Sequence, residues 1–71
     1  MSKLYSSRQI QKVLDRLGFS FISQKGSHAK FKDADGNTVI LPMGKKEIPD
    51  GTFRSILKQA GIPLQKFKEI L

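Results

Sequence analysis

The chain has 71 residues, and its 13 Lys and Arg against 6 Asp and Glu give a net charge of +7 at pH 7. This length allows one domain, which we expect to span residues 1–71. The absence of Cys and the single His exclude a disulfide framework, a thiol nucleophile and the usual zinc site built from several Cys and His ligands. No apolar run reaches the roughly 20 residues that cross a bilayer, and the first residues lack the apolar segment of a secretion signal. We therefore expect a cytoplasmic protein without membrane contact and without a bound metal.

A chain this short buries only about 60% of its unfolded surface. Its core therefore needs nearly all of the large apolar side chains, including the five Phe. A pocket for an organic cofactor would occupy volume that this core requires. We expect no cofactor, and a function carried by a few exposed residues.

The positive charge is spread along the whole chain. Residues 1–36 contain seven basic and three acidic residues, and residues 37–71 contain six and three, so the two halves carry +4 and +3. This distribution predicts a positive folded body, which attracts polyanions. We expect the partner to be a nucleic acid or an acidic protein.

The first predicted helix begins after Ser6, which can cap it while Gln9 completes a capping box. One helical face carries apolar residues at the spacing i, i+3, i+4, i+7, namely Ile10, Val13, Leu14 and Leu17. Gly18 stands where the helix should end, and glycine is favoured at the position just after a helix. The opposite face carries a basic stripe, which is more often a solvated face than a binding surface, formed by Arg8, Lys12 and Arg16.

Three short strands follow, at about residues 19–24, 28–32 and 38–41. The first two are separated by Lys25-Gly26-Ser27 and the last two by a segment containing Asp35-Gly36, and both segments favour tight turns. In the second strand two apolar residues, Ala29 and Phe31, alternate with three polar ones, which therefore point to the opposite face: His28, Lys30 and Lys32. The short connections predict an antiparallel meander.

A polar connection of residues 43–51 leads to a second helix, predicted to begin near Thr52 and to end at Gly61. Its apolar face consists of Phe53, Ile56, Leu57 and Ala60. Pro63 suits the first turn of a third, short helix, whose apolar side carries Leu64, Phe67 and Ile70 or Leu71. The order α-β-β-β-α-α predicts an α+β fold in which the helices pack on one face of a three-stranded antiparallel sheet. Double-stranded-RNA-binding domains have this layout.

His28 is the one side chain of a type that titrates near neutrality, and it follows a predicted tight turn. Lys25, Lys30 and Lys32 neighbour it in sequence and are our candidates for contacts with RNA phosphates. A histidine beside a phosphodiester, with lysines to stabilise developing negative charge, can cleave RNA without a metal, because the 2′-hydroxyl supplies the nucleophile. An ordinary exposed histidine without a catalytic role is the alternative.

Several segments together resemble the HicA family of toxins, also called YcfA-like. The Gly26-Ser27-His28 turn is moderately specific alone, and it becomes highly specific when joined at this spacing to the helix that begins Gly51-Thr52-Phe53-Arg54-Ser55. The resemblance extends from about residue 6 to residue 70. Its segments are residues 18–19, 24–28 with the alternating strand behind them, 35–36, 39–42 and 51–61.

The resemblance implies the toxin of a type II toxin–antitoxin system, an mRNA interferase with a double-stranded-RNA-binding-domain-like fold. It implies that His28 is the catalytic residue and that Gly26 and Ser27 form the RNA-binding turn. It also implies a HicB-type antitoxin that masks the histidine, with DNA contacted only through the antitoxin complex. Many relatives carry a second histidine where this chain has Met43-Gly44-Lys45, so this chain either acts without it or uses Lys45.

Two other functions stay open on the sequence. The first is an RNA-binding module of the same fold without chemistry, which the basic composition and the missing second histidine favour. The second is a role chiefly in protein binding, in which a chain of charge +7 pairs with an acidic antitoxin.

Overall fold

The computed structural model describes residues 3–71. Met1 and Ser2 lie outside the described residues. They belong to the domain expected over residues 1–71 and to the N-terminal segment expected to lack a secretion signal. The elements follow the predicted order: α1 (Ser7–Arg16), β1 (Ser20–Lys25), β2 (His28–Lys32), β3 (Thr38–Pro42), α2 (Asp50–Ala60) and α3 (Leu64–Ile70). Among residues 3–71, none of the helices is long and apolar enough to span a membrane.

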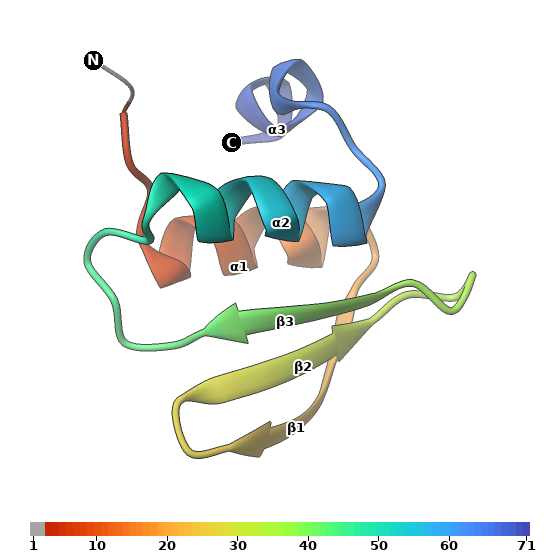
Figure 1. Cartoon of the computed structure of the whole chain (residues 1–71). Helices are drawn as coiled ribbons and strands as arrows, with labels where there is room; N and C mark the ends of the chain where they lie inside the picture. The colour runs from red at the N-terminus through yellow and green to blue at the C-terminus, as the bar shows by residue number, and fades with distance from the viewer. Residues whose placement is uncertain (1–2) are drawn as a thin grey trace.

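The three strands form one antiparallel sheet in the order β1-β2-β3. Lys25 on β1 and Pro42 on β3 both pair with His28 on β2, and a β-bulge lies between Phe21 and Ser23. Both α1 and α2 cover one face of this sheet, and α3 lies beyond them on the side away from the sheet (Figure 1). The predicted meander and the α+β, double-stranded-RNA-binding-domain-like layout are confirmed.

The first helix begins as the sequence predicts. The Gln9 amide donates a hydrogen bond to Ser6 Oγ over 3.1 Å, and the Ser6 amide donates one to Gln9 Oε1 over 2.9 Å, which completes the capping box. The helix ends at Arg16, so Leu17 lies just past its end and is only partly buried. Leu17 nevertheless packs against the core from this position, on the side that the apolar spacing predicts.

The second helix also ends as predicted but begins earlier. Gly61 takes a left-handed conformation with φ of 73°, which glycine adopts without strain, and it ends α2. The helix starts at Asp50, ahead of the expected Thr52. Pro63 immediately precedes α3 and serves as its N-cap.

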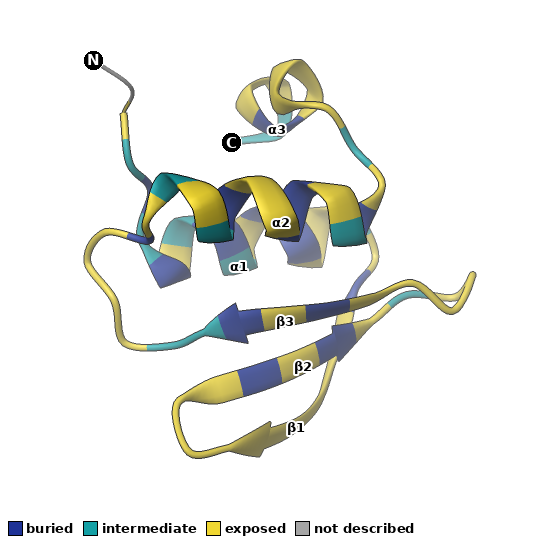
Figure 2. Ribbon diagram, in the orientation of Figure 1, coloured by how far each residue is buried: buried dark blue, intermediate teal, exposed yellow. Residues whose placement is uncertain are grey.

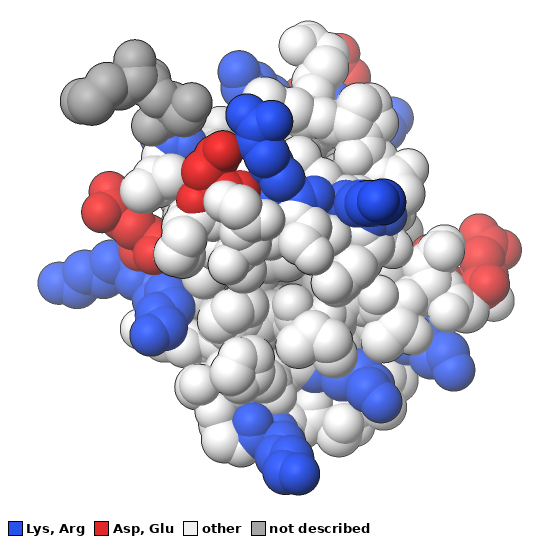
Figure 3. Space-filling view, viewed as in Figure 1, with Lys and Arg blue, Asp and Glu red and all other residues white. Residues whose placement is uncertain are grey.

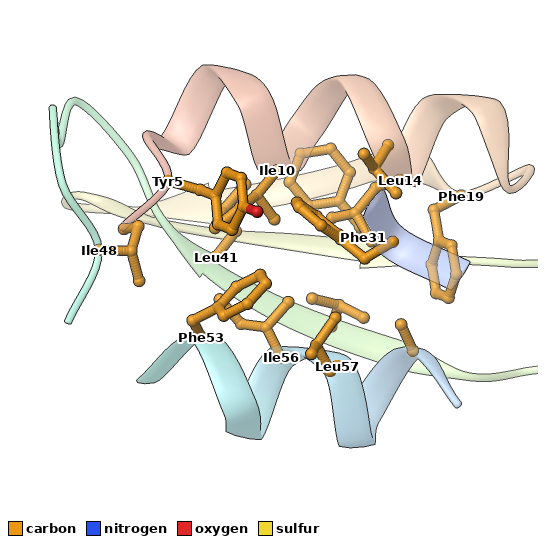
Figure 4. Close-up of a cluster of buried hydrophobic side chains, with 14 of the residues drawn as sticks. Tyr5, Ile10, Leu14, Phe19, Phe31, Leu41, Ile48, Phe53, Ile56 and Leu57 are labelled. Atoms are coloured by element: carbon orange, nitrogen blue, oxygen red, sulfur yellow. The ribbon is translucent and has the colours of Figure 1, made fainter. Parts of the chain in front are cut away.

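The core lies between the sheet and the helices (Figures 2 and 4). Phe31 on β2 and Leu41 on β3 are fully buried beneath the two covering helices. Tyr5, Phe53 and Phe67 form an aromatic cluster with ring centroids 4.9–5.1 Å apart. The other buried apolar residues are Ile10, Val13, Leu14, Phe19, Ala29, Val39, Ile48, Ile56, Leu57 and Ala60.

The expectation that all five Phe enter the core is wrong for Phe21. Phe21 and Ile22 on β1 are each 53% exposed, and every residue of β1 is exposed, because the helices cover β2 and β3 but leave β1 open (Figure 2). Leu64, predicted on the apolar side of α3, is also exposed, whereas Phe67 on the same helix is buried as expected.

The two edges of the sheet differ. On the β3 edge the Ile40 amide donates a hydrogen bond to Gln59 Oε1 on α2 over 2.9 Å. Pro42, also on β3, has no amide hydrogen, and its carbonyl accepts a hydrogen bond of 2.6 Å from Ser7 Oγ. The β3 edge is therefore closed, whereas the β1 edge is open.

Candidate active site

The turn between β1 and β2 places the candidate catalytic residue. Gly26 has a φ of 59°, in the left-handed region that favours glycine, and its carbonyl accepts a hydrogen bond of 3.0 Å from Gln24 Nε2. The expectation that Gly26 holds a special turn conformation is confirmed. The chain then enters β2 directly at His28, so the turn fixes the backbone of that residue.

His28 lies on the central strand of the sheet and is exposed. Its neighbour Ala29 points into the core, so the alternation of the strand directs the His28 side chain to the outer face, away from the helices. Lys25 on β1 and Pro42 on β3 flank it in register. The imidazole is therefore open to a polymer and is not packed among the Phe side chains.

The two lysines of β2 share the outer face with His28. Lys30 is two residues along the strand and Lys32 is four, and both are exposed. At about 3.4 Å per residue, Lys30 lies roughly 7 Å from His28 along the strand and Lys32 about twice as far. The structure thus gathers Lys25 and Lys30 around His28, whereas Lys32 lies at the other end of β2.

These cations face no acidic partner. Within residues 3–71 the only ion pair joins Arg54 to Asp50, on α2. Over the sheet, in the lower part of the view in Figure 3, the charged side chains are basic. Unpaired ammonium groups around an exposed imidazole attract a phosphodiester and can stabilise the charge that develops when it is cleaved.

A second basic feature lies next to the turn and was not foreseen from the sequence. The Met43 amide donates a hydrogen bond of 2.6 Å to the Ser27 carbonyl, which brings the connection after β3 against the turn. A groove between this connection and the start of α1 carries three basic side chains: Arg8, Lys45 and Lys46. Arg8 is distant in sequence from the two lysines, so only the hydrogen bonds that join the segments reveal the cluster.

A comparison with protein families matches residues 7–62 to the family described as "HicA toxin of bacterial toxin-antitoxin". The chain belongs to the HicA toxin family. The matched region runs from the start of α1 past the end of α2, and it contains the His28 turn and the whole sheet. A comparison with curated proteins gives no match.

This HicA protein is therefore the toxin of a bacterial toxin–antitoxin system, and the family implies an antitoxin partner. The resemblance seen in the sequence is confirmed at the level of the family and of the fold. The surface around His28 lies within the family region, and α3 lies outside it.

Proposed function

We propose that this HicA toxin is an endoribonuclease that cleaves messenger RNA without a metal, with His28 as general acid and base. The observation that carries the proposal is the position of His28. It is exposed at the start of the central strand, directly opposite Lys25 and beside Lys30 on the outer face. Because its substrate is messenger RNA, the toxin acts in the cytoplasm.

The proposed reaction uses the RNA itself as nucleophile. His28 accepts the proton of the 2′-hydroxyl as the 2′-oxygen forms a bond to phosphorus. Lys25 and Lys30 stabilise the additional negative charge on the phosphoryl oxygens. The bond from phosphorus to the 5′-oxygen then breaks, and the imidazolium returns its proton to that oxygen. The products are a 2′,3′-cyclic phosphate and a 5′-hydroxyl.

The remaining residues of the candidate site would bind RNA. Gly26 and Ser27 form the exposed turn that precedes His28, where backbone groups can approach the sugar–phosphate chain. Lys32, at the far end of β2, is suited to a phosphate more distant from the scissile bond. The exposed sheet face thus supplies both the proton-transfer group and the cations along which a strand can lie.

The first prediction tests His28 directly. In a defined messenger RNA incubated with excess EDTA, we expect His28→Ala to lower the cleavage rate by about 10²–10⁴-fold, because general acid–base catalysis contributes a factor of this size. The measurement is the appearance of fragments that end in a 2′,3′-cyclic phosphate. Lys66→Gln on α3 is the control, and it should cleave as the wild type does. Equal cleavage by wild type and His28→Ala would contradict the proposal.

A binding module without chemistry is the second candidate function, since His28 is the only histidine and the sheet face is basic. Such a module would bind RNA with a steep salt dependence and leave it intact after prolonged incubation. The EDTA assay separates the two functions, because it measures cleavage and not only binding.

We further propose that the antitoxin is of the HicB type and neutralises the toxin by covering His28 with an acidic surface. The excess of positive charge on the toxin favours such a partner, and opposite potentials accelerate association. DNA would then be contacted only through the antitoxin complex. Addition of an equimolar antitoxin should stop RNA cleavage, and continued cleavage in the assembled complex would contradict the masking of His28.

A further inference from the structure

The groove beside the His28 turn is the strongest unassigned feature of the surface. Its walls are the first residues of α1 and the connection that follows β3. The basic side chains on it are those of Arg8, Lys45 and Lys46, and all three residues are exposed. The other lining residues are Ser6, Ser7, Gln11, Met43 and Gly44.

Backbone hydrogen bonds hold the lysine-bearing wall in place. The Ser7 amide donates to the Lys45 carbonyl over 3.0 Å, and the Lys45 amide donates to Ser7 Oγ over 3.0 Å. Ser7 Oγ also donates to the Pro42 carbonyl over 2.6 Å, and Ser7 is buried. Two hydrogen bonds therefore fix the Lys45 backbone to α1, and a third fixes the end of β3, so the lysines are carried on an ordered backbone and can bind an anion at a lower entropic cost.

Backbone hydrogen bonds join the groove to the turn that carries His28. His28 pairs with Pro42 across the sheet, and the next residue, Met43, is hydrogen-bonded to the Ser27 carbonyl. Met43 and Gly44 then form part of the groove lining. The groove therefore begins one residue beyond the strand position that pairs with His28.

The attraction of the groove for anions comes from its side chains. Three of the first four amides of α1 are already engaged, since those of Ser7, Gln9 and Ile10 donate to the Lys45 carbonyl, Ser6 Oγ and the Ser6 carbonyl. The guanidinium of Arg8 can donate two parallel hydrogen bonds to a phosphate, and the two lysines add point charges. Within residues 3–71 none of these three cations has an ion-pair partner.

We propose that this groove binds a backbone phosphate of single-stranded RNA that lies next to the scissile phosphodiester. The inference rests on the proposed ribonuclease function, which it extends from a single reactive bond to a substrate of several nucleotides. RNA is favoured over an acidic protein segment because Met43, on the groove lining, is hydrogen-bonded to the turn that carries the residue proposed to act on RNA.

The test compares RNA of two lengths in the full chain. All variants carry His28→Ala, so that the RNA stays intact during the measurement. A dinucleotide is expected to reach only the turn, whereas a longer single strand is expected to reach the groove as well. For Lys45→Gln/Lys46→Gln we expect the affinity for the longer RNA to fall on the order of tenfold. The slope of log affinity against log salt should shrink by about 0.7, which is the contribution of one neutralised phosphate in a single strand. Affinity for the dinucleotide should not change.

Lys66→Gln/Lys68→Gln, on α3, is the matched control, because it removes the same charge from the far side of the helices. It should leave both affinities close to those of the His28→Ala background. The substitutions at Lys45 and Lys46 should fold normally, since the hydrogen bonds that hold this segment use the backbone of Lys45 and not its side chain. Thermal unfolding of each variant checks this point.

The outcomes separate the groove from the proposed function. The groove proposal would be overturned if the groove variant and the α3 control lost RNA affinity equally, or if affinity fell equally for the two RNA lengths. Neither result would bear on cleavage by His28. A loss that affects only antitoxin binding would also overturn it and assign the groove to the antitoxin. If the wild type binds RNA through the groove but never cleaves it, the ribonuclease function fails and the groove remains an RNA site.

Discussion

At the scale of single residues, Asp33 organises the hairpin between β2 and β3. Its Oδ1 accepts hydrogen bonds from the amides of Asp35 and Asn37 over 3.1 and 2.8 Å, and its Oδ2 accepts one from Asn37 Nδ2 over 2.8 Å. The hydrogen bond from the Asn37 side chain is the largest cause that holds the pKa of Asp33 below its ordinary value of 3.8. The folded hairpin therefore favours the ionised carboxylate.

This shift predicts a pH dependence of stability. Because the pKa of Asp33 is lowered on folding, its carboxylate stabilises the fold at pH values above 3.8, and this contribution is lost as the pH falls through the lower pKa of the folded state. Urea unfolding at about pH 6 should therefore show Asp33→Asn to be less stable than the wild type. At about pH 2.5 the difference should shrink, and a difference of the same size at both pH values would contradict the assignment.

At the scale of elements, the two aromatic residues paired across β1 and β2 have different surroundings. Phe31 is fully buried under α1 and α2, whereas Phe21 is 53% exposed. Their rings meet nearly edge to face, with centroids 5.9 Å apart. The core is therefore centred on β2 and β3, and β1 adds little buried area to it.

The difference predicts unequal effects of truncation. Phe31→Ala should lower the free energy of unfolding by about 3–5 kcal/mol, because it leaves a cavity in the core. Phe21→Ala should lower it by about 1 kcal/mol, which reflects the loss of the aromatic contact and of partial burial. Denaturant titration of both variants measures these values, and a similar loss in both would show that β1 is covered in solution.

The sequence predicts the elements well where the signal is local. The capping box of Ser6 and Gln9, the helix-ending Gly61 and the alternation around His28 each act within a few residues, and each is confirmed. The exposure of Phe21 depends instead on where the helices end over the sheet, which no local pattern encodes. The groove depends on the hydrogen bonds of Ser7 to the backbone at Pro42 and Lys45, which only the tertiary structure shows.

At the scale of the whole molecule, the net charge is +7, and few of the basic side chains within residues 3–71 form an ion pair with an acidic one. The one ion pair within residues 3–71, between Arg54 and Asp50, is exposed and joins neighbouring turns of α2. Such a pair contributes little to stability. Repulsion among the remaining cations therefore opposes the compact state, and the same cations favour binding to a polyanion.

This balance predicts opposite responses to salt. Raising the NaCl concentration from about 0.01 M to about 0.15 M shortens the Debye length from roughly 30 Å to 8 Å. The midpoint of thermal unfolding of the free protein should rise, because repulsion is screened, while its affinity for RNA should fall. Calorimetry and RNA titrations on the same samples compare the two. A midpoint that falls with added salt would show that attractive pairs outweigh repulsion in the fold.

The unequal edges of the sheet limit how far it can extend by backbone pairing. A strand can add beside β1, whereas Gln59, Ser7 and the imino acid Pro42 block such addition beside β3. If two copies joined through β1, they would form one six-stranded sheet. Both of its edge strands would then be β3, which is blocked. Pairing of this kind would end at two chains, because neither outer strand of the combined sheet would offer a free edge.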